Sequence, residues 1–301
     1  MSDTADLRIS RRLGDKSGKG RVAETLALVS TITAVLSALL FLSLLLAKVA
    51  VDGLPALSWR FLWSYPSADP TRAGIKAALF GSVYIMGLVA AMAIPVGVGA
   101  ALYLEEFGEK TRFARLVELN IQNLAAVPSI VYGLLGAGVL VKTFRMGESL
   151  ITGATILTLL VLPLMIVASR EAIRSVPPSL REAAYALGAT RWEVASRVVL
   201  PAASRGIVTG VVLALSRAIG EAAPLVTIGA LTYVTFEPRS LSDRFTVLPI
   251  QIFNWISRPQ ERFHQNAAAA ILVLLGVLIL FNGTAVWLRA RAQRAEARWR
   301  T

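Results

Sequence analysis

Apolar residues lie in long unbroken runs along the chain and do not alternate regularly with polar positions. A helix that crosses the hydrocarbon core of a bilayer needs about 20 such residues. Each run of that length predicts one spanning helix, and the runs are Leu26–Val51, Ile75–Leu104, Leu116–Val141, Leu150–Ser169, Gly206–Leu231 and Ala267–Leu288. The pattern therefore predicts an all-α integral membrane protein with six transmembrane helices.

Composition supports this class and argues against several others. The 301 residues are 55% hydrophobic, and the mean hydropathy of +0.62 is too high for a soluble domain of this size. There is no cysteine and only one histidine, His264, so neither a metal site nor a Ser-His-Asp triad is supported. We predict no catalytic residue and no metal ligand, which argues against a membrane enzyme.

The basic residues predict the orientation in the membrane. Most of the 31 lysines and arginines lie in the two tails and in the connections at 105–115 and 170–205. The positive-inside rule therefore places both termini and the 170–205 loop in the cytoplasm. We expect a basic tail at 1–24, a permease domain at 25–291 and a second tail at 292–301. Basic tails beside anionic membrane lipid explain the net charge of +12 without a nucleic-acid partner.

Two charged residues interrupt the fifth apolar run. Arg217 and Glu221 are four residues apart, so both would lie on one face of a continuous helix and pair. A charge at bilayer depth costs about 2.5–3.5 kcal/mol on insertion scales and usually has a function. One interpretation is that Arg217 binds an anion in passage with Glu221 as its counter-ion. The alternative is a permanent ion pair that holds helices together.

Prolines predict breaks inside the spans. Pro128 and Pro224 each remove a backbone donor, and a proline fits the first turn of a new half-helix. If half-helices begin there, their N-terminal ends point into the membrane, as in transporters that hold anions. A simple kink is the alternative. Ser129, Ser216 and Thr227 are candidate hydrogen-bond donors to such an anion.

The 170–205 loop carries its own helix signals. Pro177-Pro178 ends the fourth helix, and Ser179 with Glu182 forms a capping-box pattern that predicts a short helix at Leu180–Leu187. Gly188 predicts a left-handed corner, and Thr190 with Glu193 is a second capping box. We therefore expect a bent two-helix hairpin that fills a partner's groove, with a helix lying on lipid as the alternative.

The same loop resembles the EAA loop of permease subunits of ABC importers. The matching positions are Glu182-Ala183-Ala184, Gly188 and Leu200-Pro201, with Val198 in place of the usual isoleucine. Two further segments resemble phosphate-specific permeases, the PstA type more closely than the PstC type. They are Ala126–Leu134 and Leu215–Leu225.

This resemblance implies the type I permease fold of ABC importers and a bacterial cell membrane location. Glu182, Ala183, Ala184, Gly188 and Pro201 would then dock on a separate ATPase subunit. The implied partners are a PstC-like second permease, PstB-like ATP-binding subunits and a PstS-like external phosphate-binding protein. ATP and Mg²⁺ would be bound by the partner, with no cofactor in this chain.

The residues themselves agree that an ATPase must be elsewhere. The segment Gly14–Gly20 has the wrong spacing for a P-loop and no Ser/Thr after its lysine. Sulfate and molybdate permeases also contain an Arg-Ala-x-Gly-Glu stretch, so another oxyanion stays open, as does an ion-coupled transporter or channel. The long external loop at 233–266 has no assigned role, and its segment Phe245–Trp255 is predicted to lie along the membrane surface.

Overall fold

The computed structural model describes residues 19–108, 112–230 and 233–297, and all regular structure in those ranges is helical. The elements are α2 (Lys19–Gly53), α3 (Trp59–Trp63), α4 (Lys76–Leu102), η1 (Tyr103–Phe107), α5 (Arg112–Ala125), α6 (Ser129–Gly136), η2 (Ala137–Thr143), α7 (Leu150–Arg174), α8 (Pro178–Ala186), α9 (Arg191–Glu193), η3 (Val194–Val199), α10 (Leu200–Ile219), α11 (Ala223–Thr227), α12 (Leu248–Ile256) and α13 (Glu261–Ala297). The three η segments are π-helical. The chain divides into two compact units at Val51/Asp52.

The first unit is built on α2, an apolar helix of 35 residues. At 1.5 Å per residue it is about 50 Å long, enough to cross a bilayer. Its polar side chains bond to its own backbone: Ser30 and Thr31 donate to the Ala27 carbonyl, and Ser43 donates to the Leu39 carbonyl. The helix therefore satisfies these hydroxyl groups internally, as a lipid-exposed span requires.

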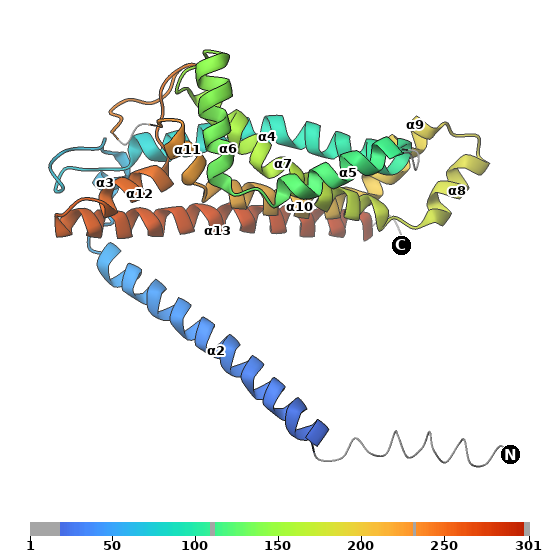
Figure 1. The fold of residues 1–301 in the computed structure, drawn as a ribbon, viewed down its shortest axis with the longest axis horizontal. Coiled ribbons are helices and arrows are strands. Elements are labelled where there is room, and N and C mark those ends of the chain that lie inside the picture. The colour runs from blue at the N-terminus through green and yellow to red at the C-terminus, as the bar shows by residue number, and fades with distance from the viewer. Residues whose placement is uncertain (1–18, 109–111, 231–232, 298–301) are drawn as a thin grey trace. The chain divides into compact units, whose positions relative to one another are not determined.

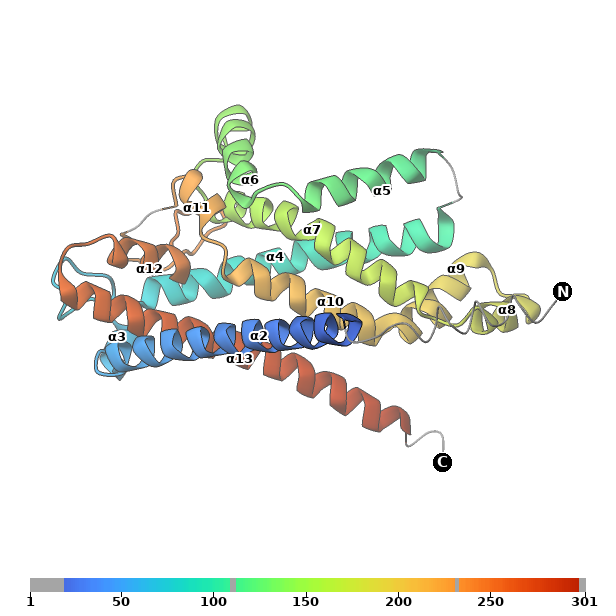
Figure 2. The same ribbon diagram turned by 60° about the horizontal axis from the view of Figure 1, so that its bottom comes forward.

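The second unit is organised around α7, which packs between α4 and α10 (Figures 1 and 2). Small residues allow the close approach of α10 and α7. A Cβ atom added to Gly206 would lie 2.5 Å from the Ala172 Cβ, and one added to Gly210 would lie 2.6 Å from the Ala168 Cβ. Such small-residue seams replace the hydrophobic effect as the source of helix association in lipid.

The predicted spans are recovered with two corrections. Among the described residues, five helices are long and apolar enough to cross a membrane, and the bent pair 115–125 and 129–143 makes a sixth if counted as one span. The third predicted span is therefore not a straight helix. The fifth extends from Arg191 and ends at Ile219, whereas its predicted end, Leu231, lies outside the described residues. The predicted domain boundaries stay a prediction.

The segment Phe245–Trp255 was predicted to lie along the membrane surface, and this was wrong. Phe245 and Trp255 are each 1% exposed. The Trp255 ring lies 5.9 Å from that of Phe61 and 6.4 Å from that of Phe263. The segment, which includes most of α12, is part of the protein core because α3, α4 and α13 cover its apolar side chains.

Candidate functional site

Pro128 separates α5 from α6. The chain bends by 101° between the two helical segments, and α6 rises steeply from the end of α5 (Figure 1). Pro128 cannot donate to the carbonyl four residues earlier, which belongs to Leu124. The Tyr132 hydroxyl donates to that carbonyl at 2.8 Å. The same carbonyl also accepts the Val127 amide at 3.2 Å. The freed backbone group is thus satisfied on both sides of the break, which is the condition for non-helical backbone at membrane depth.

Replacing Tyr132 by phenylalanine is expected to destabilise the protein by about 1 kcal/mol, because the Leu124 carbonyl loses the shorter of its two hydrogen bonds and keeps only that from the Val127 amide at 3.2 Å. Thermal unfolding in detergent measures the change. The matched control is Tyr103→Phe, since the Tyr103 side chain is exposed. Equal midpoints for the two variants would contradict a structural role for the Tyr132 hydroxyl.

A second break follows α10. That helix ends at Ile219, Gly220 is its C-cap, and a new turn begins with Pro224 in the first turn of α11. Both predicted half-helices therefore exist. However, α11 is only five residues long. Of the two half-helices, only α6, which continues into η2, is long enough to direct a helix dipole at an anion.

The two half-helices pack directly against each other at Gly133 of α6. A Cβ atom added there would lie 2.7 Å from the Pro224 Cα and would overlap the Thr227 hydroxyl. The half-helices that follow the breaks at Pro128 and Pro224, far apart in sequence, are therefore in direct contact.

Arg217 lies in the last turn of α10, beside the second break. The prediction that Arg217 and Glu221 share one helical face was wrong, because the helix ends between them. They still pair: Arg217 Nε is 3.5 Å from Glu221 Oε1, with side chains 48% and 19% exposed. The contact is long for a charge-assisted hydrogen bond. Arg217 is therefore only weakly paired, and about half of its side chain is exposed.

Within the described residues, no hydrogen bond joins the other predicted path residues to Arg217. Ser216 donates to Asn282 Oδ1 of α13 at 2.7 Å. Thr227 donates to the Pro224 carbonyl at 2.8 Å within α11. Ser129 is the first residue of α6 and is half-buried. Their contact with a substrate stays a prediction.

The loop between α7 and α10 forms the predicted hairpin. Gly188 has φ +83°, in the left-handed region, and the Thr190–Glu193 capping box is present. The first capping box is wrong, since α8 starts at Pro178 and has Pro177 as N-cap. The physical reason is the double proline: Pro178 holds its predecessor extended and is itself preset for the first helical position.

The hairpin lies at the end of the second unit away from α3 and α12 (Figure 1), and several of its apolar side chains are exposed. Leu187 is 89% exposed and Trp192 is 63% exposed, and Leu180 and Tyr185 are also open. Of the predicted coupling residues, Glu182 and Ala183 are exposed, Ala184 packs on the core beneath, and Pro201 lies exposed in the first turn of α10. A surface this apolar at the tip of a loop is typical of an interaction site.

One ion pair attaches this hairpin to the transmembrane helices, and it was not predicted from the sequence. Arg181 of α8 contacts Glu106 of η1 at 2.9 Å. Its guanidinium also donates to the carbonyls of Val176, at 2.6 Å, and Ile173, at 3.0 Å. The Glu106 side chain is only 8% exposed. The adjacent pair Glu105-Glu106 at the end of an apolar run was the available signal.

Further ion pairs lie next to this one. Arg170 of α7 binds Glu105 at 2.9 Å and Glu118 of α5 at 3.1 Å, and Arg174 binds Glu105 at 2.8 Å. These contacts join α5, η1 and α7 at the hairpin end of the unit.

A set of apolar helices with two joined breaks beside a half-open arginine, and with a protruding apolar hairpin, defines a membrane transport subunit. The chain belongs to the family described as binding-protein-dependent transport system inner membrane components, whose pattern matches residues 93–294. It is a multi-pass protein of the cell membrane and a transport subunit, not an enzyme.

Individual relatives agree with this family. The probable ABC transporter permease protein YqgI of Bacillus subtilis (strain 168) is 31% identical over 294 residues, covering 93% of this chain and 96% of the relative. The phosphate transport system permease protein PstA 1 of Mycobacterium tuberculosis (strain ATCC 25618 / H37Rv) is 32% identical over 279 residues, covering 91% and 90%.

Solved structures share the fold. The bacterial alginate ABC transporter, in complex with an alginate pentasaccharide-bound periplasmic protein, contains a chain that superposes with a TM-score of 0.67 at 15% identity. The match covers 92% of this chain and 98% of that one. A chain of the MetNI methionine ABC transporter superposes with a TM-score of 0.55 at 19% identity, covering 72% and 94%. The predicted ABC importer permease fold is confirmed.

Proposed function

We propose that this chain is the permease subunit of an ATP-driven phosphate importer and forms half of the translocation path. The observation that carries the substrate assignment is the similarity to phosphate transport permeases, at about 30% identity over most of the chain. The loosely paired arginine at the joined breaks supports an anionic substrate. A guanidinium stays ionised in apolar surroundings and binds phosphate oxygens through two parallel hydrogen bonds.

Arg217 and Glu221 would act in sequence during transport. In the empty path Glu221 offsets the charge of Arg217 at 3.5 Å. An arriving oxyanion displaces the carboxylate, and the carboxylate later competes to release it, which keeps the affinity modest enough for passage. An Arg–Glu pair has no net charge to offer a dianion. Further positive charge would come from a PstC-like second permease.

The hairpin supplies the energy coupling in this proposal. Its exposed apolar side chains would fill a groove on a PstB-like ATPase subunit, which binds ATP and Mg²⁺, so this chain holds no cofactor. A PstS-like external protein would deliver phosphate. This arrangement places α8 and both termini in the cytoplasm.

Transport by the complex copurified with this chain tests the function. In proteoliposomes, ³²P-phosphate uptake is expected to require ATP and to continue without an ion gradient. Uptake driven by a proton or sodium gradient without ATP would support the ion-coupled alternative. ATP-driven uptake of sulfate or molybdate in preference to phosphate would change the assigned substrate, while the assignment as a permease of an ATP-driven importer would stand.

The corner residue of the hairpin gives a second test. Gly188→Val is expected to lower ATPase retention in a pull-down at least tenfold, because valine strongly opposes φ +83°. Gly188→Asn is the matched control, since asparagine tolerates the left-handed region. If the valine variant retained the ATPase as well as the asparagine variant, the corner would not be needed for docking.

A further inference from the structure

A pocket of about 380 Å³ lies at the end of the second unit opposite the hairpin. Its walls come from the segment between α2 and α4 and from the first turns of α13. Arg60, Arg72 and Arg262 line it, together with polar groups such as Ser58 and Asn266. The lining contains no carboxylate.

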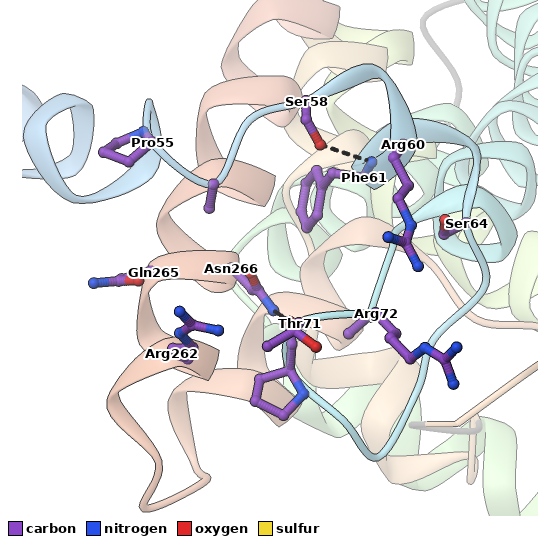
Figure 3. A pocket seen from close by; sticks show the side chains of 13 residues that line it. Pro55, Ser58, Arg60, Phe61, Ser64, Thr71, Arg72, Arg262, Gln265 and Asn266 are labelled. Carbon is purple, nitrogen blue, oxygen red and sulfur yellow. Dashed lines mark hydrogen bonds between the residues drawn. The ribbon is translucent and has the colours of Figure 1, made fainter.

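Two of these arginines face each other across the pocket. In Figure 3 the Arg60 side chain extends into it from α3 and the Arg262 side chain extends toward it from α13, whereas Arg72 turns away at the edge. Two guanidinium groups directed into the same pocket repel each other unless an anion lies between them. Within the described residues, neither has an ion-pair partner.

One acidic residue beside the pocket, outside its lining, is Asp69. Thr71 donates to Asp69 Oδ1 from both its hydroxyl, at 2.7 Å, and its amide, at 2.8 Å. These hydrogen bonds, the hydroxyl one foremost, hold the pKa of Asp69 below its ordinary value, and nearby Arg72 and Arg262 contribute in the same direction. Asp69 therefore offsets part of the positive charge of Arg72 and Arg262.

The walls are fixed by the fold. Ser58 caps α3 by accepting the Phe61 amide proton at 3.2 Å, and the Phe61 ring is buried against Trp255. Asn266, which is 7% exposed, donates to the Pro70 carbonyl at 2.8 Å and joins α13 to the loop. The backbone that carries Arg60 and Arg262 is therefore held in place, and anion binding would have to order only their exposed side chains.

We infer that this pocket binds a phosphate group between Arg60 and Arg262. Fork-shaped guanidinium donors on opposite walls match the tetrahedral distribution of phosphate oxygens. The group could belong to free orthophosphate or to an anionic lipid headgroup. Trp59 and Trp63, which are 74% and 48% exposed beside the pocket, are residues that favour the headgroup level of a membrane. The inference does not depend on the transported substrate.

Site-resolved chemical modification tests this binding. The full-length protein in phosphatidylcholine nanodiscs is treated with phenylglyoxal, and the rate at each arginine is followed by peptide mass spectrometry. One arm adds 10 mM orthophosphate against chloride at equal ionic strength. The other replaces part of the lipid by phosphatidylglycerol without phosphate. Binding with a dissociation constant of about 1 mM would slow modification of Arg60 and Arg262 roughly tenfold at this concentration.

The internal control is Arg239, an exposed residue outside the pocket. Protection in the orthophosphate arm identifies the free ion, and protection in the phosphatidylglycerol arm identifies a headgroup. The variant Arg60→Gln is expected to abolish protection of Arg262. Protection in neither arm, equal protection of Arg239, or full protection of Arg262 in the variant would each overturn the inference. Transport is not measured, so the outcome is separate from that of the proposed function.

Discussion

Replacing Arg217 by glutamine is expected to lower ATP-driven phosphate uptake about 100-fold while leaving the amount of complex in the membrane unchanged. Glutamine keeps the length and a donor group but loses the charge and the bidentate geometry. A charge-assisted contact of this kind contributes about 3 kcal/mol, which corresponds to roughly that factor in rate. Uptake in proteoliposomes and quantitative blotting of the complex are the measurements.

Two companion variants separate transport from structure. If the pair only holds helices together, Arg217→Gln should lose membrane abundance and Glu221→Gln added to it should restore abundance by removing the unpaired carboxylate. If Arg217 binds substrate, the double variant stays inactive at normal abundance. The single variant Glu221→Gln should then bind phosphate more tightly and release it more slowly. Normal uptake by Arg217→Gln would exclude this residue from the mechanism.

Local signals predicted much of the fold. Pro128 and Pro224 marked real breaks, and Gly188 marked a real left-handed corner, because each residue restricts its own backbone wherever it occurs. The misplaced start of α8 has the same cause. Two prolines in succession determined the helix start more strongly than the hydroxyl of Ser179, and a pattern match that weighed only the capping box missed this.

Burial could not be predicted in the same way. The apolar stretch at 245–255 suits a lipid interface and a protein core equally well. The two environments are distinguished only by the tertiary structure, in which α3 and α13 pack against this stretch. The ion pairs raise a similar difficulty, because Glu106 and Arg181 are 75 residues apart in sequence and meet through the packing of α4 and α7. Such a contact leaves no local periodicity.

The Arg181 contacts lead to the second large expected effect. Arg181→Gln should reduce the phosphate transported per ATP hydrolysed several-fold, even where the ATPase still binds. The side chain joins α8 both to Glu106 on the extension of α4 and to the last carbonyls of α7. In the proposed mechanism, this guanidinium would transmit a movement of the hairpin to both spans. Without it, the ATPase would move α8 with less displacement of the path.

Stability must be measured beside coupling, because removing Arg181 leaves the nearly buried Glu106 carboxylate without its cation. Breaking such a pair costs about 3 kcal/mol, which should lower the unfolding midpoint by several degrees. Glu106→Gln is the milder partner variant. It leaves the Arg181 cation without a carboxylate, but the guanidinium keeps its hydrogen bonds to the Val176 and Ile173 carbonyls, so less stability should be lost. Arg174→Gln is the matched control: its side chain is 54% exposed, and surface pairs contribute at most about 1 kcal/mol. If Arg181→Gln and Glu106→Gln both transported as much phosphate per ATP as Arg174→Gln, this contact would serve only to hold α8 in place.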